Sequence, residues 1–204
     1  MFAVIEGIEG SGKSTLQAGL AEALRARGER VATTREPGGS PLGDAIRAIF
    51  LSTELEVAPV AEAMLVNAAR AQHVASLIRP ALERGETVIC DRFVDSTLAY
   101  QGYGRGLDLS MLRGLCELAV GGLGADLTIV LDCEPTLSRE RLDARGSARD
   151  RLENERYGFH QRVREGFLAL ARGSSRHVVL DASDTRENLV AAALAAIEGL
   201  GIRG

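Results

Sequence analysis

The residues with the clearest chemistry lie near the N-terminus, between an apolar run and a helical pattern. The sequence matches the spacing G-x-x-x-x-G-K-S over residues 7–14, which are Gly7, Ile8, Glu9, Gly10, Ser11, Gly12, Lys13 and Ser14. Glycines allow the backbone N–H groups of such a loop to surround a phosphate, and the N-terminus of the following helix adds partial positive charge. In this motif the lysine neutralises the β and γ phosphate oxygens and the hydroxyl binds Mg²⁺. The loop therefore predicts a site for a nucleoside triphosphate.

A second pair with possible chemistry follows the third apolar run of the chain. Asp91 and Arg92 stand where many hydrolytic ATPases carry Asp-Glu. Asp91 can hold Mg²⁺ through water, and Arg92 can bridge two substrates that both carry phosphate. Lys13 is the only lysine of the chain, so the Asn-Lys-x-Asp loop with which GTPases read guanine is excluded. P-loop folds serve many functions, and these two observations argue against a GTPase and a hydrolytic ATPase.

The elements that position these residues follow an alternation of apolar runs and helical patterns, which indicates βαβ units. We expect an α/β fold of the P-loop NTPase type, with a five-stranded parallel sheet flanked by helices on both faces in three layers. The predicted strands are Phe2–Glu6, Arg30–Thr34, Thr87–Cys90, Leu127–Asp132 and His177–Asp181. The predicted helices are Lys13–Arg27, Pro41–Leu51, Ala58–Arg84, Ser110–Val120, Pro135–Asp143, Leu152–Arg172 and Thr185–Leu200, the last capped by Asp184. No linker or repeat divides residues 1–204, which we interpret as a single domain.

Composition bounds the setting in which the chain works. Its 204 residues are 46% hydrophobic and carry a net charge of −4, so the basic surplus of a nucleic-acid or membrane-surface binder is missing. No apolar run reaches about 18 residues, so no membrane span is expected. Cys90, Cys116 and Cys133 are odd in number and lie in apolar runs, which favours buried thiols in a reducing compartment. We therefore expect a cytoplasmic protein.

Four segments resemble bacterial thymidylate kinase in order and spacing, and together they span most of the chain. They are Phe2 to Thr15, Thr34 to Gly39 (TREPGG), Asp91 to Gly102 (with DRF and STLAYQG), and Leu131-Asp132 with Pro135. The resemblance implies a nucleoside monophosphate kinase-like fold and transfer of the γ-phosphoryl group of ATP to dTMP, with Mg²⁺ as cofactor. It also implies a homodimer.

The resemblance assigns roles to charged residues. Arg92 reaches both the acceptor phosphate and the γ-phosphate, Asp91 supports the metal with Ser14, and Glu9 faces the 3′-hydroxyl of the sugar or Arg92. Arg47 grips the monophosphate and Arg70 hydrogen-bonds the thymine carbonyl. The alternatives are a solvated loop residue for Glu9, an exposed helix arginine for Arg47 and a surface ion pair for Arg70.

Further residues are expected to shape the substrate pockets. The dTMP pocket would also contain Pro37, Val66, Ser96, Thr97, Tyr100 and Gln101, and the ATP site would extend to Thr15 and Arg145. Tyr100 resembles the ring that crowds the ribose 2′ position, with a core tyrosine as the alternative, and the bond before Pro37 is expected to be cis. Val66 stands where the family usually has a phenylalanine that stacks on thymine. Either Phe50, Phe93 or Tyr103 supplies the ring instead, or the aliphatic side chain of Val66 packs against the base.

The stretch from about 143 to 153 resembles the lid of these kinases, with Gly146-Ser147-Ala148 as a hinge. Because Gly10 stands where some members carry a P-loop arginine, the resemblance implies that a lid arginine is catalytic. Arg149 or Arg151 is the candidate, with Arg145 behind them and with Asp150 and Glu153 holding lid arginines. We interpret Arg139 and Arg141 as solvated helix residues.

Two alternatives remain open at this point. Val66 leaves room for a kinase of another pyrimidine monophosphate such as dUMP, and retention of the loop without turnover would give a non-catalytic nucleotide-binding module. His73, His160 and His177 are separated in sequence and are interpreted as structural or surface residues.

Overall fold

The structure is a computed structural model that describes residues 1–146 and 148–200. Its centre is a parallel sheet with the strand order β2-β3-β1-β4-β5. The strands are β1 (Phe2–Glu6), β2 (Val31–Arg35), β3 (Thr87–Asp91), β4 (Leu127–Asp132) and β5 (His177–Asp181). The side chains of β1 are buried along its whole length, as expected for a central strand that is covered on both faces.

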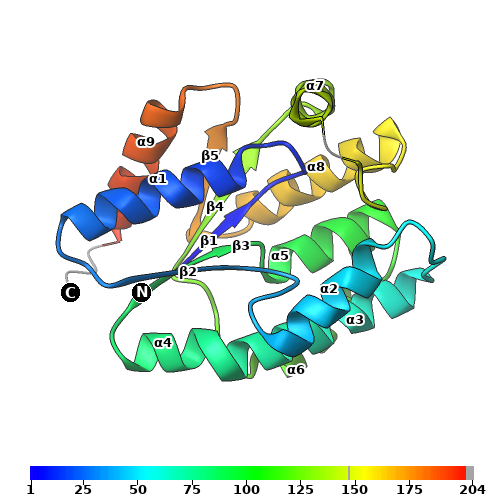
Figure 1. Cartoon of the computed structure of the whole chain (residues 1–204), viewed down its shortest axis with the longest axis horizontal. Coiled ribbons are helices and arrows are strands. Elements are labelled where there is room, and N and C mark those ends of the chain that lie inside the picture. Colours follow the sequence, from blue (N-terminus) through cyan, green and yellow to red (C-terminus); the bar gives the residue numbers. More distant parts are fainter. Residues whose placement is uncertain (147, 201–204) are drawn as a thin grey trace.

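Helices connect the strands. They are α1 (Lys13–Ala26), α2 (Pro41–Leu51), α3 (Pro59–His73), α4 (Arg79–Glu83), α5 (Val94–Thr97), α6 (Leu109–Val120), α7 (Pro135–Arg145), α8 (Tyr157–Arg172) and α9 (Arg186–Gly199). Two π-helical segments, η1 (Val74–Ile78) and η2 (Leu98–Gly104), continue α3 and α5 respectively. Because η1 runs directly into α4, the chain forms one long helical stretch between β2 and β3 (Figure 1).

Helices cover the sheet on both faces (Figure 1). On one face α1 and α9 contact each other and bury Leu16, Leu20 and Ile197 in the same cluster as Ile5 of β1. On the other face Val74 and Ile78 of the long helical stretch pack with Phe2, Val4, Val88 and Cys90 of the strands. The structure therefore confirms the predicted three-layer α/β fold.

Most predicted elements are confirmed, and two segments differ. Residues 94–104 form α5 and η2, where no helix was predicted. The helix predicted from Leu152 begins at Tyr157, because residues 150–154 form a separate turn. In that turn Asp150 Oδ1 accepts hydrogen bonds from the backbone N–H groups of Leu152 and Glu153, both at 2.9 Å. Glu153 Oε2 accepts one from the N–H of Asp150 at 3.1 Å.

The structure also tests the predicted helix cap, the predicted cis peptide bond and the state of the cysteines. The N-cap of α9 is Thr185, whose hydroxyl accepts from the N–H of Asn188, and the predicted cap Asp184 was wrong by one residue. The Glu36–Pro37 peptide bond is cis, as predicted. Cys90, Cys116 and Cys133 are free and buried. Of the predicted hinge, Ser147 lies outside the described residues. Among the described helices none is long and apolar enough to cross a membrane.

Candidate active site

The predicted phosphate loop lies at the carboxyl end of β1. Gly7, Gly10 and Gly12 have φ of 141°, 69° and 96°, conformations that side-chain-bearing residues rarely adopt. Gly12 caps α1 without any side-chain hydrogen bond, so the first N–H groups of the helix are available to an anion. The loop therefore has the shape and the donors of a phosphate cradle.

Lys13 lies inside the loop that carries it. Its ammonium donates to the carbonyl oxygens of Gly7 at 3.0 Å and Ile8 at 2.8 Å, and its side chain is 7% exposed. Burial, followed by the charge of Arg92, lowers the pKa of Lys13 to about 8. A phosphate at this place would raise that pKa again, because it adds negative charge beside the ammonium.

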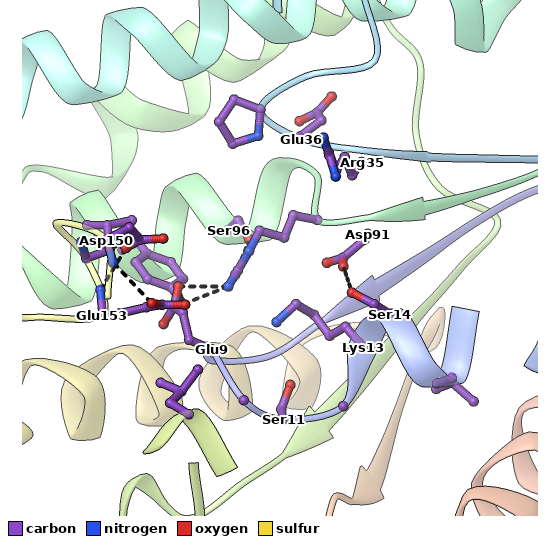
Figure 2. Close-up of a pocket in the computed structure, with 18 of the residues that line it drawn as sticks. Glu9, Ser11, Lys13, Ser14, Arg35, Glu36, Asp91, Ser96, Asp150 and Glu153 are labelled. Atoms are coloured by element: carbon purple, nitrogen blue, oxygen red, sulfur yellow. Dashed lines mark hydrogen bonds and ion pairs between the residues drawn. The ribbon is translucent and has the colours of Figure 1, made fainter. Parts of the chain in front are cut away.

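Ser14 and Asp91 form the end of the site that suits a divalent cation. Ser14 Oγ donates to Asp91 Oδ2 at 3.1 Å (Figure 2). Asp91 Oδ1 is buried, and none of the described residues forms a hydrogen bond with it. Both residues line the main cavity. Mg²⁺ prefers oxygen ligands and keeps several waters, so a hydroxyl beside an unsatisfied carboxylate oxygen fits this ion.

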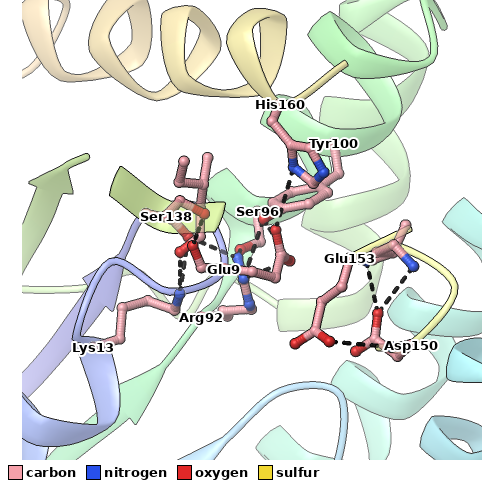
Figure 3. A network of polar contacts seen from close by, with 12 residues as sticks. Glu9, Lys13, Arg92, Ser96, Tyr100, Ser138, Asp150, Glu153 and His160 are labelled. Carbon is pink, nitrogen blue, oxygen red and sulfur yellow. Dashed lines mark hydrogen bonds and ion pairs between the residues drawn. The ribbon is translucent and has the colours of Figure 1, made fainter. Parts of the chain in front are cut away.

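Arg92 joins the loop to the opposite wall of the cavity. Its guanidinium donates to Gly7 O at 3.0 Å, to Ser96 Oγ at 3.1 Å, to Glu9 Oε1 at 2.9 Å and to the Tyr100 hydroxyl at 3.1 Å (Figure 3). The Tyr100 hydroxyl also donates to Glu9 Oε1, at 2.7 Å. Burial alone would raise the pKa of Glu9, but Arg92 and Lys13 outweigh it and hold that pKa below its usual value. The carboxylate is therefore charged and oriented.

Glu6, which precedes the loop, fixes the backbone that follows Arg92. Its carboxyl oxygens accept from the N–H groups of Phe93 at 2.8 Å and Ser96 at 3.1 Å, and from Ser96 Oγ at 2.6 Å. Burial, helped by the charge of Asp95, raises the pKa of Glu6 to about 7. Arg92 itself has φ 74° and is the only residue other than glycine with positive φ among the described residues. Glu6 thus contributes to holding Arg92 in a strained backbone conformation.

The pocket beyond Arg92 has a buried arginine on its wall. Arg70 is 2% exposed and donates to Glu36 Oε2 at 2.7 Å, Thr97 Oγ1 at 2.9 Å and Phe93 O at 2.8 Å. Arg70 is therefore no surface ion pair, which excludes the simpler alternative. The cavity wall around it also includes Pro37, Arg47, Val66, Ser96, Thr97, Tyr100 and Gln101.

The cavity wall also includes Arg47 and one of the aromatic rings considered for stacking on the base. Arg47 is partly buried and donates to Pro37 O at 3.0 Å, and burial, followed by the charge of Arg35, lowers its pKa. Of the three rings considered for stacking, Phe50 lines the cavity, whereas Phe93 and Tyr103 do not. A cavity of about 640 Å³ contains both the phosphate loop and this pocket.

The comparisons with known proteins give one answer. The profile described as "Thymidylate kinase" matches residues 5–193. The chain is 48% identical over 202 residues to the thymidylate kinase of Deinococcus radiodurans, with 98% of each chain covered. It is 51% identical over 189 residues to that of Geobacter sp. strain M21, covering 89% of this chain and 84% of the relative. The chain belongs to the thymidylate kinase family. The crystal structure of the Ehrlichia chaffeensis thymidylate kinase has the same fold, with a TM-score of 0.78, 31% identity and 97% and 98% of the two chains covered.

Not every arginine of the predicted thymidylate kinase lid reaches the cavity. Arg145 lines it and pairs with Glu153 at 2.9 Å. Arg149 pairs with Asp143, and Arg151 donates to Phe50 O at 2.9 Å and to the buried carboxylate of Glu62 at 2.8 Å. Among the described residues, the cavity lining includes neither Arg149 nor Arg151, and it also lacks Gly7 and Ile8 of the loop.

Sequence reasoning missed several residues of the cavity. Arg141 was interpreted as a solvated helix residue, but it lines the cavity and donates to Ala182 O at 2.9 Å and Gly10 O at 3.4 Å. Its four-residue spacing from Arg145 on α7 was the available signal, since both then share one helix face. Arg35, Asp184 and Arg186 also line the cavity. Arg139 is exposed, as predicted.

The histidines were only partly understood from the sequence. His73 is fully buried and contacts Thr34 Oγ1 at 2.7 Å and Glu36 Oε1 at 3.1 Å, which confirms its structural role. Its ring also lies near Cys90, although the sequence separates the two. His160 lies 3.7 Å from Glu9 Oε2, beside the phosphate loop.

Proposed function

We propose that the cavity carries out the reaction of the thymidylate kinase family, transfer of the γ-phosphoryl group of ATP to dTMP with formation of dTDP and ADP. The main observation in support is the position of Arg92. Its guanidinium donates hydrogen bonds to Gly7 O in the phosphate loop and to Glu9 and Tyr100 at the acceptor pocket. Phosphoryl transfer depends on positioning and on neutralising charge on the transferred group. An arginine at the meeting point of donor and acceptor does both.

The donor end would hold ATP by its phosphates. The N–H groups of residues 10–15 and the ammonium of Lys13 provide the contacts, and Ser14 and Asp91 would hold Mg²⁺. The bound ion supplies neutralisation of the phosphate oxygens of ATP. Arg145 and Arg141 reach the same cavity from α7, and we propose Arg145 as the lid arginine that acts on the γ-phosphate. Arg149 and Arg151 would need to leave Asp143 and Glu62 to take that role.

The acceptor end would hold dTMP in an extended pocket. Arg47 and Arg92 would bind its phosphate, Tyr100 and Glu9 would face the sugar, and Arg70 would lie over the base edge. Pro37 and Ser96 complete the floor around the phosphate, with Val66, Thr97, Gln101 and the ring of Phe50 around the base. Phe50 is 3% exposed and lines the cavity, so it is the candidate for the aromatic contact that Val66 does not provide.

The protein would act as a cytoplasmic homodimer. Large apolar side chains are exposed on the three helices α2, α3 and α6, of which α3 contacts both others. Met64 of α3 is 58% exposed and Leu118 of α6 is 82% exposed, and a dimer interface on these helices would cover such side chains. A Leu118→Arg variant should become monomeric by light scattering, and a variant that stays dimeric would place the interface elsewhere.

A coupled ADP-release assay tests the activity. ATP and Mg²⁺ are supplied with dTMP, dUMP, dCMP, dGMP, dAMP or UMP at equal concentration. Turnover with dTMP and its loss in Arg92→Ala support the proposal. Equal or better turnover with dUMP would favour the second candidate, a broader pyrimidine monophosphate kinase, which Val66 suggests. ATP binding without turnover on any acceptor would leave a non-catalytic nucleotide-binding module.

A further inference from the structure

The carboxylate of Glu9 has one saturated and one unsatisfied oxygen. Oε1 accepts from Arg92 at 2.9 Å and from the Tyr100 hydroxyl at 2.7 Å. Oε2 is buried and has no hydrogen-bond partner among residues 1–146 and 148–200. A buried carboxylate oxygen without a donor is unfavourable, so a donor close to Oε2 has a reason to be there.

His160 of α8 is the nearest such group. Its Nδ1 lies 3.7 Å from Glu9 Oε2 (Figure 3) and is itself buried, without a hydrogen-bond partner in the described part of the chain. The His160 side chain is 12% exposed, and its ring packs edge-on against Phe159, with 5.6 Å between centroids. Two unsatisfied buried atoms of complementary type therefore face each other, and an approach of about 1 Å would give an ordinary hydrogen bond.

The other charged groups near Glu9 have different partners. Arg92 binds Oε1, and the ammonium of Lys13 donates to the carbonyl oxygens of Gly7 and Ile8. Asp150 of the lid is an acceptor for backbone N–H groups. Among the described residues, His160 is thus the side chain placed to donate to Oε2.

We propose that His160 is a positioning residue for the reaction, donating its Nδ1–H to Glu9 Oε2. The inference rests on the proposed function, because Glu9 holds Arg92 at the point where donor and acceptor meet. With both oxygens bonded, the plane of the carboxylate cannot rotate, and Arg92 and Tyr100 keep their places. Without His160, Glu9 turns toward other donors and the acceptor pocket loses its fixed wall, whereas the phosphate loop keeps its contacts with ATP.

Matched variants separate this hydrogen bond from packing. His160→Asn places an amide nitrogen close to the position of Nδ1, His160→Gln places it close to Nε2, and His160→Leu removes both. We expect kcat/KM for dTMP to fall about 10-fold in His160→Leu and His160→Gln, with KM for ATP changed less than about 2-fold. His160→Asn should return to within about 2-fold of the parent. The proposal would be overturned if kcat/KM for dTMP fell equally in His160→Asn and His160→Gln, or if His160→Leu kept the kcat/KM of the parent.

A spectroscopic measurement tests the contact without turnover. Long-range ¹H–¹⁵N NMR of the imidazole should show that His160 carries its proton on Nδ1, and Glu9→Gln should shift that nitrogen signal. A ring protonated on Nε2 alone, unaffected by Glu9→Gln, would contradict the proposal. Because this readout needs no substrate, it remains decisive even if dTMP were not phosphorylated. Thermal unfolding of each variant checks that the fold is intact.

Discussion

Gly10 of the phosphate loop lies directly against the backbone of Ser138 in α7. A Cβ added at Gly10 would meet Ser138 O at 2.7 Å, closer than van der Waals contact allows, and the φ of Gly10 is 69°. Ser138 Oγ also donates to Glu9 O at 2.6 Å, so α7 and the loop are fixed to each other. A side chain at residue 10 would therefore have to push α7 away. The contact gives a physical reason for the glycine at residue 10.

Gly10→Ala should weaken both the fold and ATP binding. Positive φ and the clash with a backbone oxygen together predict a loss of about 1–3 kcal/mol in the free energy of unfolding. ATP affinity should fall as the loop distorts, which isothermal titration measures. Gly158→Ala is the matched control, because among the described residues its Cβ would come within 4 Å of the flexible Arg162 side chain alone, at 3.8 Å. Equal stability of the two variants would show that the loop and α7 separate easily.

Glu6 should make stability depend on pH. Its pKa is raised to about 7 in the folded chain by burial, against 4.5 ordinarily, so folding favours the protonated form. Protonated Glu6 contributes its full share to the free energy of unfolding below about pH 4.5, and this share is lost as the pH rises through about 7. A pKa shift of this size corresponds to about 3 kcal/mol. Glu6→Gln keeps a neutral side chain at all pH values. Urea unfolding should therefore show that the free energy of unfolding of the parent, relative to that of Glu6→Gln, falls from pH 5 to pH 8.

The opposite trend would mean that Glu6 is charged in the folded protein. A parent that gained stability relative to Glu6→Gln between pH 5 and 8 would show that Arg92 outweighs burial. Asp95 faces Glu6 and pairs with His177 Nε2 at 2.6 Å. His177→Gln is a useful control, because it changes the partner of Asp95 and leaves Glu6 in place.

The parts of the molecule that sequence predicted well are those defined by local patterns. The phosphate loop depends on glycine and lysine spacing within eight residues, and the strands on short runs of Val, Ile and Leu. These signals are carried by neighbours in the chain, so a single sequence contains them. The bounds of α2 and of β1, β4 and β5 agree residue for residue with the predictions.

The parts that were missed depend on contacts between distant residues. The π-helical η2 contains Gly102 and Gly104, poor helix formers, and is held by α8: Gly104 packs against Phe159, and Tyr103 against Gly166. The partners of Arg141 are Gly10 and Ala182, far away in sequence. Propensity does not show such contacts, which is why this arginine was misread.

Arg70 should be costly to remove because it is the partner of a buried carboxylate. In Arg70→Met, His73 is the one described side chain that still pairs with the Glu36 carboxylate, which is 4% exposed. Breaking a buried pair typically costs about 3–5 kcal/mol. Urea unfolding should show a loss of this size. In the double variant Arg70→Met/Glu36→Gln part of the loss should return, because no charge stays unpaired. A double variant that is no better than the single one would show that the hydrogen bonds to Thr97 and Phe93 O matter more than the charge pair.

Variants of Arg145 and Arg151 should affect different properties, kcat in the first case and the free energy of unfolding in the second. Arg145 lines the cavity beside the phosphate loop, so Arg145→Ala should lower kcat about 100-fold, with little change in KM for dTMP. Arg151 binds Phe50 O and the buried Glu62, so Arg151→Ala should lower the free energy of unfolding. Arg139→Ala, an exposed neighbour on α7, is the control for charge. If Arg149→Ala or Arg151→Ala caused the larger loss of kcat at unchanged stability, those arginines would enter the cavity during turnover, as the sequence predicted.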